Sequence, residues 1–215
     1  MVGGVVCRVA VAATVWMAIS VAAPSPGFAH EAEATRSLVL QVDAEGIAGL
    51  WDVVQQGKRA ALQVAMFDLD RDKKLSGFEK AALAGAFVER GMAGVRIQAG
   101  TTVLRPAGSI TARLVEDAGR DKSIEAVGLV SYEVTLAGER RWIIEIAVAE
   151  GYGNLAVQLQ TLGPWRLAGA EFSKLAEDRR GLAAPKTILP GGSLRFEIER
   201  GREKPQMGAK AGGNR

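Results

Sequence analysis

Residues 131–148 read SYEVTLAGERRWIIEIAV, and this stretch decides the fold because apolar residues recur in it at every second position. A period of two places alternate side chains on opposite faces of a β-strand. The four residues Ala137–Arg140 include a glycine and separate the two alternating runs. The segment therefore predicts a β-hairpin with one buried face. The residues expected on that face are Tyr132, Val134, Leu136, Trp142, Ile144, Ile146 and Val148.

The same alternation extends in both directions from this hairpin. With the hairpin strands at 126–136 and 142–149, further strands are expected at 38–42, 47–54, 95–99, 109–116, 155–162 and 194–198. Short strands with short turns are typical of an antiparallel β-sandwich, which we expect over residues 36–200. Residues 163–184 fit less well and could form a short helix or a long surface loop. Within them Trp165 is expected to be a half-buried corner residue, with an aromatic binding residue as the alternative.

A helical period interrupts the strands after residue 54. Residues 58–67 and 77–90 each carry one apolar stripe at helical spacing, and Gly91 follows as a cap. The stripes consist of Ala61, Leu62, Ala65 and Met66 in the first helix and Ala82, Leu83, Ala86 and Phe87 in the second. The fold class is therefore mainly β with a helix–loop–helix insertion over residues 58–90.

The loop between these helices, residues 68–79, reads DLDRDKKLSGFE. Its aspartates stand at loop positions 1, 3 and 5, and its glutamate stands at position 12, with an apolar residue, Leu75, at position 8. This pattern resembles the calcium-binding loop of the EF-hand family. The resemblance implies a Ca²⁺ site in which Lys74 offers its backbone carbonyl, Ser76 binds directly or through water, and Glu79 supplies two oxygens. The implied ligands are Asp68, Asp70, Asp72, Lys74, Ser76 and Glu79.

The loop departs from the family at position 6, where Lys73 replaces the usual glycine. A non-glycine residue in the left-handed conformation costs about 1–2 kcal/mol, and the lysine adds a positive charge near the cation. An alternative remains open, because Ser76 and Glu79 alone form a capping box that starts a helix without any metal. A single loop without a partner hand is expected to bind calcium weakly, with a dissociation constant of about 10⁻⁴–10⁻³ M.

Residues 1–29 have the pattern of a secretory signal peptide. Arg8 precedes an apolar run over residues 9–23, which is too short for a lasting membrane anchor. Cleavage is expected after Ala29 or, as a second choice, after Ala34. The sole cysteine, Cys7, leaves with this segment, so thiol catalysis and thiolate metal sites are excluded. We expect a periplasmic or secreted protein that does not span the membrane after signal cleavage.

Charge and composition argue against nucleic-acid binding. The 27 basic and 24 acidic residues give a net charge of +3. Residues 201–215 hold four basic residues against one acidic and are expected to form a disordered basic tail. The rest of the chain is close to neutral and lacks a basic face with interleaved aromatic residues.

The sequence also argues against the commonest hydrolytic sites. His30 is the only histidine, which argues against a Ser-His-Asp relay, a zinc hydrolase site, and an amino-terminal copper chelate completed by a second histidine. We therefore expect a non-enzymatic calcium-binding protein that serves as a binding or accessory module of the cell envelope. Its partner could be an envelope protein, a membrane transporter or a surface polysaccharide, and calcium could act structurally or as a signal. The alternative is a secreted hydrolase or carbohydrate-active protein in which calcium is only structural.

Overall fold

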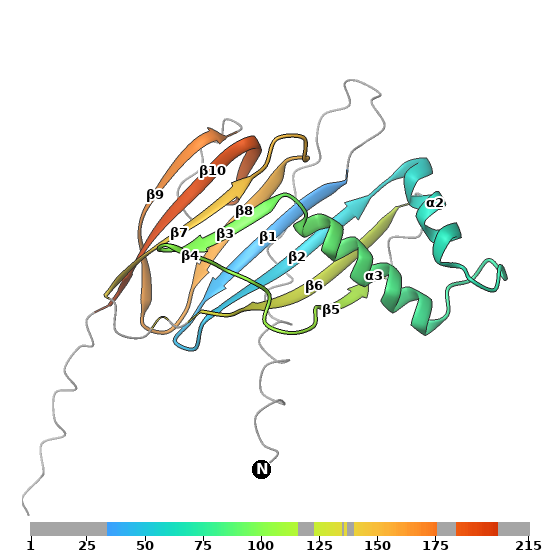
Figure 1. Cartoon of the computed structure of the whole chain (residues 1–215), viewed down its shortest axis with the longest axis horizontal. Helices are drawn as coiled ribbons and strands as arrows, with labels where there is room; N and C mark the ends of the chain where they lie inside the picture. The colour runs from blue at the N-terminus through green and yellow to red at the C-terminus, as the bar shows by residue number, and fades with distance from the viewer. Residues whose placement is uncertain (1–33, 116–122, 135, 137–139, 176–183, 202–215) are drawn as a thin grey trace, which may run out of the picture. The chain divides into compact units, whose positions relative to one another are not determined.

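The structure is a computed structural model, and it describes residues 34–115, 123–134, 136, 140–175 and 184–201. This part of the chain is mainly β with two helices, α2 and α3, inserted between the second and third strands (Figure 1). The segments expected to be a signal peptide and a disordered tail lie outside the described residues, apart from Gly201. The elements are β1 (Thr35–Val42), β2 (Ile47–Gln55), α2 (Gly57–Phe67), α3 (Gly77–Met92), β3 (Val95–Ala99), β4 (Thr102–Val103), β5 (Thr111–Leu114), β6 (Ile124–Tyr132), β7 (Arg141–Val148), β8 (Leu155–Thr161), β9 (Trp165–Leu175) and β10 (Lys186–Arg200).

The ten strands form one mixed sheet that curls into a half-barrel, so the predicted antiparallel β-sandwich is not confirmed. The strand order is β4-β3-β7-β10-β8-β1-β2-β6-β5, and β9 pairs with β10. Every pair among these strands is antiparallel except β1 with β8, which is parallel.

Strand β10 explains why one sheet replaces two layers. Its first residues, Lys186–Ile188, pair with β8, whereas Ser193–Glu199 pair with β7. Between them Gly191 has φ +71, a conformation that favours glycine, and the pairing with β9 shifts register there. Strand β10 thus pairs with β8 at its start and with β7 after the bend at Gly191, and so connects both strands within one sheet.

Helix α3 covers β2, β5 and β6 on the apolar face of the sheet (Figure 1). The approach is close because Gly128 on β6 has no side chain, and a Cβ there would lie 2.7 Å from the Val88 methyl carbons. Deeper in the core, the Trp51 Nε1 donates a hydrogen bond of 3.1 Å to the Tyr132 hydroxyl. Residues of α3 and of most strands join one apolar cluster.

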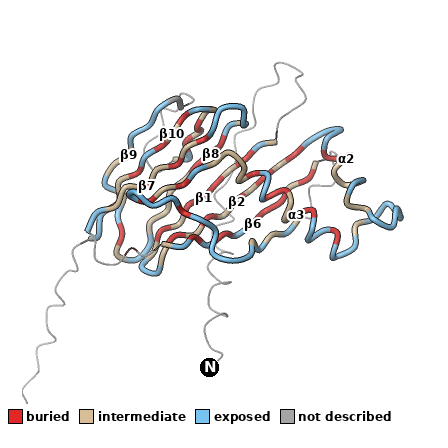
Figure 2. Tube along the Cα trace, in the orientation of Figure 1, coloured by how far each residue is buried: buried red, intermediate tan, exposed pale blue. Residues whose placement is uncertain are grey.

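Four details differ from the sequence-based expectations. The hairpin predicted over residues 131–148 is wrong, because β6 and β7 are not neighbours in the sheet: β6 pairs with β2 and β5, and β7 pairs with β3 and β10. Alternation identifies a strand and its buried face but does not specify the strand with which it pairs. Residues 165–175 form strand β9, where a helix or a loop was expected. Trp165 is only 2% exposed rather than half-buried, because its Nε1 donates to the Asp43 carbonyl at 3.0 Å and so joins β9 to the β1–β2 turn. The apolar stripe of α2 faces solvent, and Ala60 is the only fully buried residue of that helix. Figure 2 shows the exposed trace of α2 and of the loop that follows it. No helix among the described residues is long and apolar enough to cross a membrane.

Candidate metal centre in the 68–79 loop

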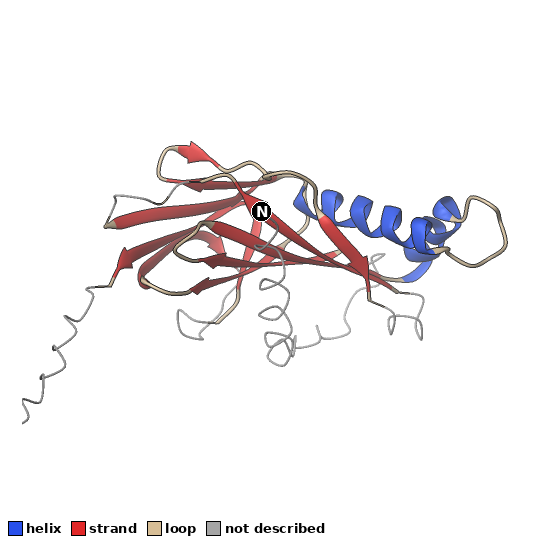
Figure 3. Ribbon diagram, turned by 90° about the horizontal axis from the view of Figure 1, so that it is seen from below, coloured by secondary structure: helices blue, strands red, loops and turns tan. Residues whose placement is uncertain are grey.

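The loop lies between the end of α2 and the start of α3, at the right-hand end of Figure 3. Its second half is fixed by the capping box that the sequence indicates. The Ser76 hydroxyl accepts a hydrogen bond from the Glu79 N–H at 3.3 Å, and the Glu79 Oε2 accepts one from the Ser76 N–H at 2.8 Å. Glu79 also reaches across the loop, where its Oε1 accepts from the Leu69 N–H at 2.7 Å. One buried carboxylate therefore holds both ends of the loop together.

The first half of the loop consists of turns made by aspartate side chains. The Lys73 N–H donates to Asp68 Oδ2 at 3.0 Å, and the Asp72 N–H donates to Asp70 Oδ1 at 3.2 Å. These bonds are of the kind by which aspartate stabilises turns. Lys73 has φ +67, the left-handed conformation that the EF-hand pattern requires at position 6, and Arg71 has φ +59.

Three of the predicted ligands come together. Carboxylate oxygens of Asp68, Asp70 and Glu79 all lie within 4.8 Å of one another. Oxygens bound to one Ca²⁺ each lie about 2.4 Å from it and hence at most about 4.8 Å apart. This spacing meets a necessary condition for one cation shared by the three residues, and it does not identify the cation. Carboxylate oxygens are the ligands that hard cations prefer.

Two of the remaining predicted ligands, Asp72 and Ser76, are engaged in other hydrogen bonds. Asp72 is exposed and lies outside the three-carboxylate group, and its Oδ1 accepts from the Lys74 N–H at 2.7 Å. The Ser76 hydroxyl serves the capping box. A full EF-hand ligand set would need Asp72 to turn inward, and it would need Glu79 to bind the ion with lone pairs that its hydrogen bonds leave over.

One buried carboxylate oxygen of the loop has no hydrogen-bond partner among the described residues. Asp68 Oδ1 is buried and accepts no hydrogen bond, although Oδ2 of the same carboxylate does. A buried carboxylate oxygen without a partner is costly. By contrast, the N–H groups of Ser76 and Leu69 hold the pKa of Glu79 below its usual value, so this carboxylate is ionised and available to a cation.

Sequence reasoning missed a second acidic residue, Asp52 in the middle of β2. Its burial, and secondarily the charge of Glu125, raise the pKa of Asp52 to about 6, while a hydrogen bond with Ser37 lowers it. Its Oδ1 also accepts no hydrogen bond. The only signal in the sequence is an aspartate between two apolar strand residues, a position that disfavours aspartate. The sole histidine, His30, lies outside the described residues.

A pocket of about 460 Å³ lies between α2, the end of α3 and the turn at 151–153. Its buried cation, Arg36, donates hydrogen bonds to the carbonyl oxygens of Gly91 at 3.0 Å, Ala93 at 2.9 Å and Asn154 at 3.4 Å, and also to that of Gly153. The guanidinium therefore fastens β1 to the end of α3 and to the β7–β8 turn. This use as a clamp argues against Arg36 as an anion-binding group.

Comparison with known protein families finds no match for this chain, and comparison with curated proteins finds none either.

Proposed function

We propose that this protein binds one Ca²⁺ ion in the 68–79 loop and serves as a non-enzymatic binding or accessory module of the cell envelope. The observation that carries the proposal is the group formed by Asp68, Asp70 and Glu79, together with the buried, unpartnered Oδ1 of Asp68. A cation at this point would satisfy that oxygen and offset the repulsion among three carboxylates.

The packing of α3 favours a local, stabilising role for calcium over a sensing role. Sensor EF-hands respond by swinging their helices apart. Here α3 contacts the sheet closely at Gly128, and its C-terminal turn is held by Arg36. Calcium would then order the loop and stabilise the folded state by mass action.

The expected affinity is low. Arg71, Lys73 and Lys74 are exposed beside the four acidic residues, and Lys73 holds a conformation that favours glycine. We expect a dissociation constant of about 10⁻⁴–10⁻³ M, as for extracellular modules, which suits a periplasmic or secreted protein. Magnesium should bind more weakly, because it demands octahedral geometry with short distances.

Calorimetric titration with calcium, combined with melting curves, tests the proposal. The wild type should bind one ion per chain, and calcium at ten times the dissociation constant should raise the free energy of unfolding by about 1.4 kcal/mol. Glu79→Gln should abolish binding, because the amide has no charge and keeps only one acceptor oxygen for the two N–H groups that bind Glu79. Asp68→Asn should weaken binding strongly, since its amide can still accept the bond from the Lys73 N–H.

Glu171→Gln is the matched control, because it removes an exposed carboxylate on β9, away from the loop. It should leave both the binding heat and the calcium-induced shift in melting temperature unchanged. If about 10 mM calcium gives neither heat nor a shift with the wild type, the loop is an acidic turn with a capping box and the proposal fails.

A further inference from the structure

The end of the helical hairpin concentrates exposed apolar side chains. Four of the nine large exposed apolar residues in the described chain fall within residues 57–80: Leu62 (64% exposed), Met66 (71%), Leu69 (72%) and Phe78 (76%). Leu62 and Met66 lie one helical turn apart on α2 and so share a face. The bond from the Leu69 N–H to Glu79 brings Leu69 to the first turn of α3, which also carries Phe78. Leu62 and Met66 line the pocket between α2 and the 151–153 turn, whereas Leu69 and Phe78 belong to the loop end, and we call Leu69 and Phe78 the tip surface.

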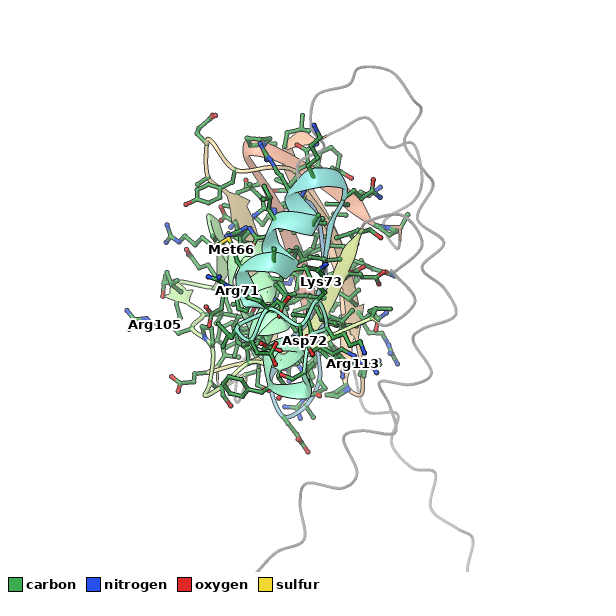
Figure 4. All side chains as sticks on the ribbon, turned by 90° about the vertical axis from the view of Figure 1, so that its right-hand side faces the viewer. Met66, Arg71, Asp72, Lys73, Arg105 and Arg113 are labelled. Carbon is green, nitrogen blue, oxygen red and sulfur yellow. The ribbon has the colours of Figure 1, made fainter. Side chains whose placement is uncertain are left out.

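Basic residues are numerous in the segment that carries the tip surface. Residues 57–80 contain six cations against four acids, a net charge of +2, and all six cations are exposed. They are Lys58, Arg59, Arg71, Lys73, Lys74 and Lys80. In Figure 4 the labelled side chains of Met66, Arg71 and Lys73 lie at the end of the molecule that faces the viewer. Calcium in the loop would raise the net charge of this segment from +2 to +4.

We propose that the tip surface docks on an anionic lipid bilayer and that calcium in the 68–79 loop strengthens the docking. The inference rests on the proposed calcium site. Apolar residues flanked by lysine and arginine are the composition of segments that lie in the membrane interface. Each cation near an anionic surface contributes about 1 kcal/mol of attraction, and calcium cancels the acidic charge that opposes it.

Charge and shape favour a bilayer over a protein occupant. Two copies of this surface would bring like charges together, which opposes self-association and grows worse with calcium. The loop projects from the end of the sheet in Figures 1 and 3. A lipid interface accepts an apolar projection without a complementary partner surface.

Co-sedimentation of the purified native protein with lipid vesicles tests the proposal. The vesicles are phosphatidylcholine with about 30 mol% phosphatidylglycerol, and pure phosphatidylcholine is the neutral control. The partition constant on anionic vesicles should be about tenfold higher in calcium than in EDTA. The bound ion adds two positive charges, and each contributes part of the full attraction to the anionic surface. Binding to neutral vesicles should be weak in both conditions.

Two variants separate the roles of the tip surface and of the calcium loop. Leu69→Ser combined with Phe78→Ser should lower partition on anionic vesicles at least about tenfold, while calorimetry still shows calcium binding. Asp68→Asn, whose amide oxygen can still accept the bond from the Lys73 N–H, should remove most of the calcium enhancement. Phe172→Ser is the matched control, because it removes an exposed phenylalanine (60%) on β9, at the opposite end of the sheet, and should change nothing.

Each result distinguishes this inference from the proposed function. Calcium binding by calorimetry without vesicle binding overturns the docking surface and leaves the calcium site intact. Vesicle binding that is equal in EDTA and calcium overturns the coupling, and an absence of calorimetric heat overturns the calcium site. Equal binding to neutral and anionic vesicles, or a calcium-dependent dimer in sedimentation analysis, also overturns the docking surface.

Discussion

Helices α2 and α3 carry the same apolar spacing in sequence but differ in burial. In α3 the side chains of Leu83, Phe87 and Val88 are fully buried against the sheet, whereas in α2 Leu62 and Met66 face solvent. Both segments are helical, as their period predicts. The difference teaches that periodicity identifies a helix, but the surface available to receive it decides which side chains are buried.

Helix α3 packs closely on the sheet because glycines stand at two of the contact points. At Gly128 the sheet leaves room for Val88, and on the helix Gly91 leaves room for Val53 of β2. Helix α2 makes fewer contacts and buries only Ala60 completely. We infer that α3 belongs to the hydrophobic core, while α2 leaves its apolar stripe exposed.

The largest expected effect tests this difference directly. Leu83→Ala should lower the free energy of unfolding by about 2–5 kcal/mol, because it removes fully buried methyl groups and leaves a cavity. The matched change Leu62→Ala should stay within about 0.5 kcal/mol, since that side chain is 64% exposed. Urea unfolding of both variants measures the difference. Equal losses would mean that α2 is packed as firmly as α3.

The opposite face of β2 provides the next effect, which depends on pH. Val53 faces α3, so its neighbour Asp52 points away from the helix. The pKa of Asp52 is raised to about 6 in the folded protein, so the stability contributed by its neutral form is full below its ordinary pKa of 3.8 and is lost as pH rises through 6. Asp52→Asn should therefore raise stability at pH 8 by roughly 2–3 kcal/mol.

The same variant should have little effect near pH 3, where Asp52 is neutral in both the folded and the unfolded protein. Melting curves from pH 3 to about 8 compare the variant with wild type, and Glu171→Gln serves as the control for loss of an exposed carboxylate. A variant that is destabilised at pH 8 would show that the Asp52 carboxylate is needed in its charged form.

The strands themselves could be predicted well, but their partners could not. Residues 95–99 form β3 as expected, and Ile144, Ile146 and Val148 are buried on the predicted face. Alternation shows which face is buried but not what covers it, so a half-barrel and a sandwich look alike in sequence. The parallel pair of β1 with β8 joins segments more than a hundred residues apart, and no local pattern encodes it.

Residues 165–175 show a second kind of limit. They form an edge strand whose Phe172 is exposed, so strict alternation is missing and a helix or loop looked equally suitable. The turns of the 68–79 loop, by contrast, depend on neighbours within twelve residues and could be predicted locally. Asp52 could not be predicted, because its burial depends on residues from other strands.

The close contact between α3 and the sheet gives the third prediction. Gly128→Ala places a Cβ 2.7 Å from the Val88 methyl carbons and should lower the free energy of unfolding by about 1–3 kcal/mol through overpacking. Gly85→Ala is the matched change on α3, where nothing lies within 4 Å of the new Cβ. It should stabilise the protein by about 0.5–1 kcal/mol through higher helix propensity. A neutral Gly128→Ala would show that α3 can shift away from the sheet.

The smallest expected effect lies in the loop that joins the two helices. Lys73 holds φ +67, which costs about 1–2 kcal/mol for a residue with a side chain. Glycine removes that strain but adds freedom to the unfolded chain, so Lys73→Gly should raise stability by up to about 1 kcal/mol without calcium. It also removes a positive charge beside the carboxylates, and calcium affinity should rise by up to about tenfold, equivalent to about 1.4 kcal/mol.

The control is Lys74→Gln, which removes a charge from the same loop without changing a residue in the left-handed conformation. It should tighten calcium binding less than Lys73→Gly does. If both variants tighten it equally, repulsion and not backbone strain limits the affinity of the loop; if neither does, the loop does not fold around a cation in the way proposed.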